Sequence, residues 1–304
     1  MAVLEIESTD LAPSIVARPA PAFAMSVDVE DYFHVWAFSD VIKPAYWDGF
    51  ALRVEASTRA ALRLFDEHQV KATFFILGWV AERAPGLVRE IAAAGHEIGS
   101  HGCNHEKLGA LGRKGFEADA RRSKALLEDI AGAPVRGFRA PGFSVDKAKT
   151  PWAHEVLARA GYAYSSSTHP IAHDHYGDPH APRSPYRPIA GADLLEAPVA
   201  TAQAFGRRIS CAGGGWFRAA PYAMSSALLE RARAQLDGPP IFYFHPWELD
   251  ADQPRIAGAS AKSKLRHYLN LKSMPSKLGR LLAAKDWGRI DEALGLVANG
   301  GGIG

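Results

Sequence analysis

The sequence has few cysteines, no long apolar run and almost no net charge. Cys103 and Cys211 are the only cysteines among 304 residues, which excludes a disulfide-stapled scaffold and favours a reducing compartment. The longest mostly apolar run, residues 73–81, falls well short of the roughly 18–20 residues that span a bilayer, so no transmembrane segment is predicted. The formal net charge of +2 gives no reason to predict nucleic-acid binding.

The start of the chain also lacks a secretory signal. Residues 1–10 contain three acidic side chains and have neither a basic start nor an apolar core, so we predict a cytoplasmic protein. A hydrophobic content of 47% and a charged content of 22% are ordinary for a globular protein and exclude a disordered or fibrous chain. The composition includes 12 histidines, which raises the question of whether some of them share one site.

Short apolar runs alternate with amphipathic segments from residue 23 onward. Strands are predicted at residues 23–30, 72–77, 96–100, 135–139, 162–165, 194–198 and 241–245. Helices are predicted at residues 54–69, 85–94, 113–130, 151–160 and 221–236. This alternation favours an α/β barrel or an open parallel sheet. Residues 1–22 are predicted as a surface arm, and residues 166–192 and 206–218 as long functional loops.

Two histidines follow a predicted strand end in the segment SHGCNHEKL. His101 and His105 are four residues apart, so on a helical turn their imidazoles lie on one face and can share a divalent metal. Two unrelated surface histidines are the more common explanation of such a pair alone. Cys103 lies between them and is predicted to fill space, because its i+2 position points away from the shared face.

A group of acidic residues lies at another predicted strand end, in SVDVED. Asp28 and Glu30 point to the same side of a strand, where carboxylates repel one another unless a cation or a proton lies among them. Alone, the group is equally consistent with a solvated acidic turn. Together with the histidine pair, it predicts a three-ligand metal site with positions open for water and substrate.

Two further strand ends carry residues that suit hydrolysis. Arg139 in FRAPG could hold a carboxylate through two hydrogen bonds, and a backbone N–H after Pro141 could face a developing oxyanion. His245 ends the aromatic segment IFYFH and could act as a general acid. A buried histidine bonded to the backbone is the alternative at that position.

Motifs in this order resemble those of one enzyme family. They are SVDVED, ATFFILGWVAE, HEIGSHGCNHE, GFRAPGFS and FYFHP. They are similar to those of the NodB-homology polysaccharide deacetylases, carbohydrate esterase family four, over roughly residues 24–250. The segments DVEDYFHVWAF, HDHYG, GGGWFR and HPWELDADQPR further resemble the exosortase-locus subfamily, which is associated with bacterial exopolysaccharide biosynthesis. The resemblance implies an α/β fold: a distorted (β/α)7-type barrel at residues 23–250, with a C-terminal extension at residues 251–304 packed on it.

The resemblance also implies a metal site. Glu30 takes the place of the usual metal-binding aspartate, and it would bind one divalent metal with His101 and His105. Asp31 is the alternative carboxylate ligand. Zn²⁺ is the expected metal, with Co²⁺, Ni²⁺ or Mn²⁺ as alternatives.

The catalytic roles follow from the same resemblance. The metal would polarise the amide carbonyl and activate a bound water, from which Asp28, oriented by Arg139, takes a proton. The Gly142 N–H would help to hold the oxyanion, and His245 would protonate the leaving amine. Many family members have an aspartate near residues 164–167 that supports this histidine. Here the segment is YSSS, so His245 is expected to be less basic unless another carboxylate replaces it.

The expected substrate is an N-acetylated polysaccharide or a lipid-linked oligosaccharide. Pro141, Tyr164 and Trp247 are expected to contact it. The basic stretch 251–285 is predicted to be a solvated helical face, with a peripheral approach to anionic lipid-linked glycans or a membrane surface as the alternative.

Two other functions stay open at this point. A metal-free, allantoinase-like hydrolase of another C–N amide would have a similar barrel, although Asp28, His101 and His105 argue against it. A non-catalytic glycan-binding barrel would follow if the change at residues 164–167 had abolished activity.

Overall fold

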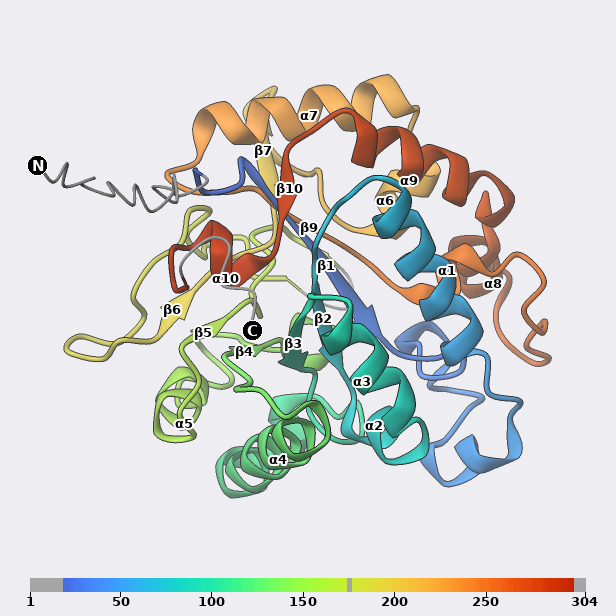
Figure 1. Ribbon diagram of the computed structural model, residues 1–304, viewed down its shortest axis with the longest axis horizontal. Helices are drawn as coiled ribbons and strands as arrows, with labels where there is room; N and C mark the ends of the chain where they lie inside the picture. Colours follow the sequence, from blue (N-terminus) through green and yellow to red (C-terminus); the bar gives the residue numbers. More distant parts are fainter. Residues whose placement is uncertain (1–18, 174–176, 298–304) are drawn as a thin grey trace, which may run out of the picture.

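The computed structural model describes residues 19–173 and 177–297, so most of the predicted arm at residues 1–22 lies outside the description. Its centre is a sheet of parallel strands surrounded by helices (Figure 1). The strands are β1 (Phe23–Val29), β2 (Thr73–Ile76), β3 (Glu97–Ser100), β4 (Gly137–Phe138), β5 (Tyr164–Ser165), β6 (Leu195–Glu196), β9 (Ile241–Phe244) and β10 (Trp287–Gly288).

The sheet curves until its two ends meet. Strands β1 to β6 pair in chain order, and β9 pairs with β1. A parallel bridge between Val199, which follows β6, and Ile241 of β9 joins the two ends. Within the described residues, β1 to β6 and β9 form the seven-stranded α/β barrel that the sequence predicted. Every residue of β1, β2 and β9 is buried, as expected for parallel strands that are covered on both faces.

Helices lie around this barrel (Figure 1). They are α1 (Val54–Glu67), α2 (Gly78–Arg83), α3 (Pro85–Ala93), α4 (Leu108–Ala131), α5 (Ala153–Arg159), α6 (Gly214–Ala219), α7 (Tyr222–Gln235), α8 (Ala261–Tyr268), α9 (Met274–Ala283) and α10 (Ile290–Ala293). Short 3₁₀ helices are η1 (Trp36–Phe38), η2 (Pro44–Gly49), η3 (Pro141–Phe143), η4 (Pro246–Leu249) and η5 (Leu271–Ser273). Pro85 opens α3, and Gly132 ends α4 in the left-handed conformation, as their residue types predict.

The predicted loop at residues 206–218 is wrong in part. Strands β7 (Thr201–Ala204) and β8 (Arg207–Ser210) form an antiparallel hairpin, and α6 follows within the same stretch. The turn consists of Phe205 and Gly206, both with positive φ, which is the backbone that a two-residue hairpin requires. Phenylalanine rarely occupies such a position, so the turn carried no recognisable sequence signal.

The C-terminal extension takes part in the barrel as well as packing on it. Its strand β10 pairs with the start of β1, where Trp287 and Gly288 lie opposite Phe23 and Ala24. The Ile290 N–H then donates to Thr73 Oγ1 at 2.8 Å. The two ends of the described chain therefore lie side by side in the sheet (Figure 1).

A polar cluster lies at the N-terminal ends of the strands, beside β10. Glu97 accepts hydrogen bonds from the hydroxyls of Thr73 and Tyr164 and from the Asp291 N–H. Burial, together with the nearby Asp291, raises the pKa of Glu97 to about 8. The cluster joins the extension to β2, β3 and β5 from inside the barrel.

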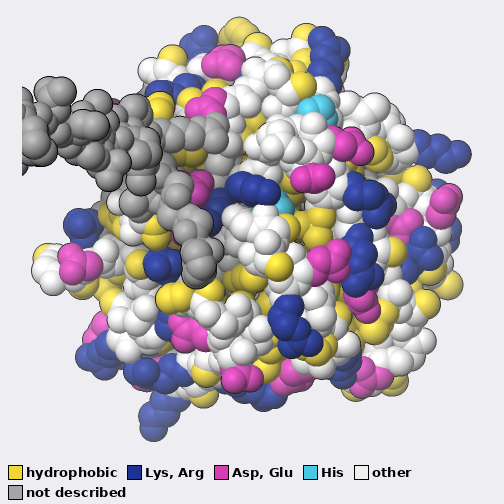
Figure 2. All heavy atoms as spheres, in the orientation of Figure 1, with side chains coloured by type: hydrophobic (Ala, Val, Ile, Leu, Met, Phe, Trp, Pro, Cys, Tyr) yellow, Lys and Arg dark blue, Asp and Glu magenta, His cyan; other side chains and the backbone are white. Residues whose placement is uncertain are grey.

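The described surface is mixed in character. Basic and acidic side chains are interspersed over the face shown in Figure 2, in keeping with the small net charge of the sequence. Among the described helices, none has the length and apolar character needed to cross a membrane.

We predict that Gly137→Ala destabilises the barrel. A Cβ at this position would lie 2.3 Å from the Tyr164 hydroxyl oxygen, and that buried ring is held in place by Glu97. Overpacking of this kind costs about 1–3 kcal/mol in the free energy of unfolding, measured by denaturant titration. Gly109→Ala in α4 is the matched control, because its Cβ meets nothing within 4 Å. Equal stability of the two variants would contradict the prediction.

Candidate active site

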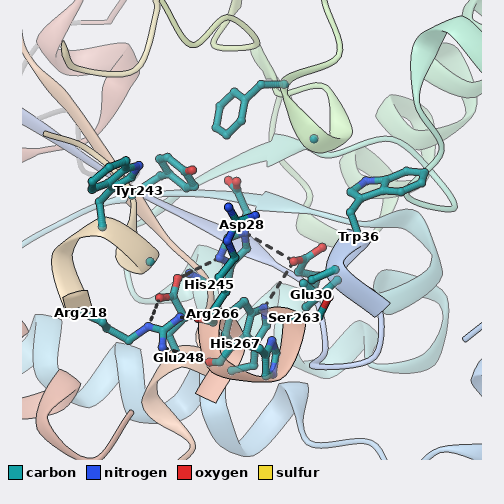
Figure 3. Close-up of a pocket in the computed structure, with 18 of the residues that line it drawn as sticks. Asp28, Glu30, Trp36, Arg218, Tyr243, His245, Glu248, Ser263, Arg266 and His267 are labelled. Carbon is teal, nitrogen blue, oxygen red and sulfur yellow. Dashed lines mark hydrogen bonds and ion pairs between the residues drawn. The ribbon is translucent and has the colours of Figure 1, made fainter. Parts of the chain in front are cut away.

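The C-terminal ends of the strands surround a cavity of about 440 Å³ (Figure 3). Asp28 and Glu30 reach it from the end of β1, and His101 follows β3. Arg139 follows β4 beneath the cavity, and His245 follows β9 at its wall. Because the strands are parallel, residues that directly follow them meet at one edge, which is where α/β folds place their sites.

Glu30, His101 and His105 form one compact, buried group. One ligand atom from each lies within 4.8 Å of the other two. The Glu30 Oε2 atom is 2.9 Å from His105 Nε2. His105 has a φ of 54°, an unusual backbone for a histidine, in the turn that carries it back towards His101.

The orientation of His101 is fixed by the backbone. Its Nδ1 atom lies 2.8 Å from the Arg139 carbonyl oxygen, which can only accept, so Nδ1 carries the proton. The other ring nitrogen, Nε2, is then left with a lone pair. Burial lowers the pKa of His101 to about 4, which keeps the ring neutral. A neutral imidazole held through its second nitrogen is the usual form of a histidine metal ligand.

The donor set fits a divalent metal. Glu30 Oε2 is buried and accepts no hydrogen bond from the described residues, although it lies 2.9 Å from His105 Nε2. Burying a carboxylate oxygen without a donor is costly, and a cation at this point would satisfy it. Although burial opposes its ionisation, His105 and His245 hold the pKa of Glu30 well below its usual range. Two imidazoles and one carboxylate match three-ligand zinc sites, and also suit cobalt, nickel or manganese.

Asp28 lies beside this group and is held by an arginine. Arg139 Nη1 donates to Asp28 Oδ1 at 2.7 Å and to Ser26 Oγ at 2.8 Å. The remaining guanidinium hydrogen bonds go to the Ser166 carbonyl and hydroxyl. Asp28 and Arg139 are both almost fully buried, so the carboxylate has one fixed orientation at the cavity wall.

The structure does not bring Asp31, the alternative metal ligand, to the histidines. Its carboxylate accepts from the backbone N–H groups of Tyr32, Arg53 and Val54, which satisfies the start of α1. Burial raises the pKa of Asp31 to about 6. Asp31 therefore has a structural role, and Glu30 is the acidic residue that faces His101 and His105.

A carboxylate that sequence reasoning missed supports His245. Glu248 Oε1 lies 2.9 Å from His245 Nδ1, and Glu248 Oε2 accepts from Arg218 Nε at 2.7 Å. Burial opposes the charge on His245, but Glu30 and Glu248 outweigh it and raise the pKa of His245 to about 9. Glu248 is therefore the other carboxylate whose absence would have made His245 less basic. The signal was present in the sequence as HPWE, where Glu248 follows the histidine by three residues.

The serines at residues 166 and 167 bond to Arg139 and to the residue that follows it instead. Ser166 holds Arg139 by two hydrogen bonds, and the Ser167 hydroxyl accepts from the Ala140 N–H. Serine at this position cannot act as the acidic partner of His245, but Glu248 supplies that partner from another side of the site. The YSSS segment is therefore compatible with an intact site.

Gly142 lies in η3 at the cavity wall and has a φ of 60°. A Cβ there would approach Trp36 Nε1 at 3.2 Å, so glycine suits both the backbone and the space. Pro141, expected to contact substrate, is buried and precedes Gly142 without lining the cavity. Trp36 lines it as well, although the sequence offered no reason to select this residue.

Two of the expected substrate contacts are positioned differently. Tyr164 is fully buried, and its hydroxyl bonds to Glu97 at the opposite ends of the strands, so the expectation that it touches substrate is corrected. Trp247 borders the cavity but is only 6% exposed. Its indole stacks with the imidazoles of His245 and His267, and its Nε1 donates to Glu30 Oε1 at 3.4 Å. Trp247 therefore supports the site more than it offers a face to a sugar.

Residues of the two predicted functional loops divide between core and cavity. Trp216 is 47% exposed and lines the cavity, whereas Phe217 is buried in the core. His173 lines the cavity, and residues 174–176 of the same loop lie outside the described residues. Cys103 packs against Asp119 away from the metal-ligand group, which agrees with a space-filling role.

Two family models match consecutive parts of the chain. Residues 45–165 match the family described as polysaccharide deacetylase, and residues 166–295 match one described as a domain of unknown function, DUF3473. The first match contains His101, His105 and Arg139. Asp28 and Glu30 precede it, and the second match contains the rest of the site.

Curated relatives align with part of the chain. A chitooligosaccharide deacetylase of Sinorhizobium fredii is 33% identical over 113 residues, which is 37% of this chain and 49% of that protein. A peptidoglycan-N-acetylglucosamine deacetylase of Bacillus cereus is 34% identical over 89 residues, 29% of this chain and 32% of that protein. The chain thus spans about half the length, or less, of these relatives.

Solved structures share the fold over most of the chain. One from Mycobacterium smegmatis, described as a candidate polysaccharide deacetylase, has a TM-score of 0.55 and 21% identity over 89% of this chain and 87% of that one. An allantoinase structure has the same TM-score with 15% identity, over 95% of this chain and 97% of that one. At these identities the likeness establishes the barrel and leaves the reaction to be argued from the site.

We predict that the protein binds one divalent metal ion per chain at Glu30, His101 and His105. After chelation and reloading with Zn²⁺, elemental analysis should find about one ion per chain. His105→Ala should lower the metal affinity by about tenfold or more, because it removes one of three ligands. His180→Ala is the control, since His180 is exposed and does not line the cavity. Retention of metal by His105→Ala at the affinity of the control would contradict the assignment.

Proposed function

We propose that this protein is a metal-dependent hydrolase that removes N-acetyl groups from hexosamine units of a glycan and releases acetate. One observation carries the proposal: a buried carboxylate, a metal-ligand group and a carboxylate-supported histidine share one cavity. They are Asp28 with Arg139, Glu30 with His101 and His105, and His245 with Glu248. The match of residues 45–165 to polysaccharide deacetylases supports the same reaction.

The residues divide the work of amide hydrolysis. A divalent metal in this site would supply Lewis-acid polarisation of the amide carbonyl and a more acidic water. Asp28, fixed by Arg139, accepts the proton of the attacking water. Gly142 lines the cavity, and its N–H is the proposed donor to the oxygen that becomes negative. His245 donates a proton to the departing nitrogen, which yields acetate and a free amine.

The support of His245 by Glu248 suits this role. With Nδ1 held at 2.9 Å by Glu248, the ring is oriented so that its Nε2 is 3.5 Å from Glu30 Oε1, beside the metal-ligand group. Arg218 fixes Glu248 in turn. The acid is thus oriented by a chain of two buried residues, as expected of a group that must meet one particular leaving atom.

The finer assignment follows the resemblance of the sequence motifs. We propose Zn²⁺ as the metal, with Co²⁺, Ni²⁺ or Mn²⁺ as alternatives, and a polysaccharide or lipid-linked precursor of bacterial exopolysaccharide as the substrate. Cys103 and Cys211 are both free and buried, which suits a reducing compartment such as the cytoplasm.

The two alternative functions predict different results. A metal-free, allantoinase-like hydrolase would keep its activity after chelation, whereas a glycan-binding barrel would release no acetate under any condition. The buried group of Glu30, His101 and His105, whose ligand atoms lie within 4.8 Å of one another, supports the metal-dependent reaction over the metal-free one.

We predict that Asp28→Asn nearly abolishes acetate release from N-acetylated oligosaccharides. Loss of a general base lowers kcat by about 10²–10⁴-fold, and enzymatic detection of acetate with Zn²⁺-loaded protein measures the effect. Ser26→Ala is a useful comparison, because it removes a neighbouring partner of Arg139 and leaves the carboxylate in place. If the wild-type protein binds glycan but releases no acetate with any divalent metal, the proposed function is wrong.

We predict that Glu248→Gln lowers kcat and leaves KM nearly unchanged. The amide keeps the shape of the side chain but loses the charge that orients His245, so the acid step slows by about tenfold or more. Glu292→Gln, at the opposite end of the barrel, is the control. Thermal unfolding must show that both variants fold, since Glu248 also pairs with Arg218. An unchanged kcat in folded Glu248→Gln protein would show that the carboxylate does not support the acid.

A further inference from the structure

The C-terminal extension supplies one wall of the cavity that contains the proposed catalytic residues. Helix α8 presents Lys262, Ser263 and Arg266 to this cavity. Ser263 and Arg266 are labelled in Figure 3. Lys262 and Arg266 are four residues apart, so they lie on one face of the helix. Both side chains are exposed and border the same space as His245 and Glu30.

Buried contacts fix α8 relative to the catalytic residues. Arg218 donates to the backbone carbonyls of Arg266, His267 and Leu269 at the end of the helix. His267 is buried, bonds to Gln253 at 2.6 Å and stacks on Trp247 at 4.2 Å between ring centroids. The same Arg218 holds Glu248, so the helix and the proposed acid share one anchor. The helix that carries the two cations therefore has a defined position beside the proposed catalytic residues.

The charges around the cavity favour an anion. Among the described lining residues there are three carboxylates and three permanent cations. The carboxylates are Asp28, Glu30 and Glu248, and the cations are Arg218, Lys262 and Arg266. A divalent metal at Glu30 would then make the cavity positive, and a charged substrate is attracted to a cavity of opposite sign.

The same cavity offers flat apolar surfaces. Trp36, Phe143, Trp216 and Tyr243 line it together with the cations. Aromatic rings pack on apolar faces, and a volume of about 440 Å³ lies in the ordinary range for binding pockets. The combination suits a molecule with both ring faces and negative charge.

We propose that Lys262 and Arg266 bind a carboxylate or a phosphate on the glycan, next to the N-acetylated sugar, so that the preferred substrate is an acidic glycan. This inference rests on the proposed deacetylase function and names its substrate class. Arginine and lysine form strong charge-assisted hydrogen bonds with both anions. The position of the two side chains at the cavity argues that the anion belongs to the molecule inside it. The basic stretch at residues 251–285 is therefore more than a solvated helical face.

The test measures binding to protein that cannot turn over its ligand. Metal-loaded Asp28→Asn and His245→Gln variants provide two inactive backgrounds, each checked for folding by thermal unfolding. Calorimetric titration compares three probes: neutral tetra-N-acetylchitotetraose, a tetrasaccharide of alternating N-acetylglucosamine and glucuronate, and UDP-N-acetylglucosamine. The second and third separate a carboxylate from a phosphate as the recognised anion.

The expected result is selective. At least one anionic probe should bind about tenfold or more tightly than chitotetraose, with an affinity that falls as salt is raised. Added Lys262→Glu and Arg266→Glu substitutions should weaken that binding by about tenfold or more and change chitotetraose binding little. The control pair Lys264→Glu and Lys272→Glu carries the same change of net charge on the extension, but neither residue lines the cavity.

Three outcomes would overturn the inference. They are failure of both anionic probes to bind at millimolar concentration, equal affinity for neutral and anionic probes, and equal effects of the two pairs of charge reversals. The proposed function is judged separately, by acetate release from the wild-type protein. Binding of an anion that depends on Lys262 and Arg266 but is followed by no acetate release with any divalent metal would reject the deacetylase and keep the anion site.

Discussion

The site depends on the hydrogen bonds and the ion pair of the Arg139 guanidinium, which is fully buried beneath the cavity. A buried charge is tolerated only when it is paired and fully hydrogen bonded, and Arg139 meets this condition through Asp28, Ser26 and Ser166. Its own carbonyl oxygen accepts from His101 Nδ1. One residue after β4 thus sets the positions of the proposed base on β1 and of one proposed metal-ligand histidine after β3. The cost of burying this charge is offset only when all of these strand ends are in place.

A second buried arginine plays the same part on the other side of the cavity. Arg218 in α6 is 3% exposed and joins Glu248 to the carbonyls at the end of α8. Through Glu248 it reaches His245, so the extension and the proposed acid are held by one group. Both sides of the site therefore follow one principle, in which a buried guanidinium converts separate segments into a single rigid wall.

Much of the barrel was predictable because its strands are short and buried, and because proline or glycine marks the ends of some of the helices between them. Periodicity together with β-branched and aromatic content predicts the strands at residues 23–30, 72–77 and 241–245. Pro85 marks the start of one helix and Gly132 the end of another, as the structure shows. The hairpin of β7 and β8 was missed because its turn has Phe205 where glycine or asparagine is usual. Strand β10 was missed because two residues give no periodicity.

The residues of the site also divide into those that the sequence could place and those that it could not. Residues that directly follow strands, such as His101 and His245, could be placed together from topology alone. Arg218 and Lys262 could not, because they lie on helices whose packing against the strand ends depends on tertiary contacts between distant segments. Asp31 and Tyr164 were expected at the site, as a metal ligand and a substrate contact, but their side chains point elsewhere. Closeness in sequence to site residues did not determine the direction of either side chain. The orientation of a side chain near a strand end depends on which backbone donors and buried partners lie nearby.

The distribution of the site over the chain argues against independent modules. The segment matched to polysaccharide deacetylases contains His101, His105 and Arg139 but neither proposed proton-transfer residue. His245 and its support lie in the second matched segment, and that segment also supplies β9 and β10, which flank β1 where Asp28 and Glu30 arise. Removing the second segment would therefore expose β1 and leave Arg139 without the enclosed setting that makes its ion pair effective. A segment that completes both the barrel and the cavity is in a position to define the substrate, because it contributes wall residues that are not among the proposed metal ligands.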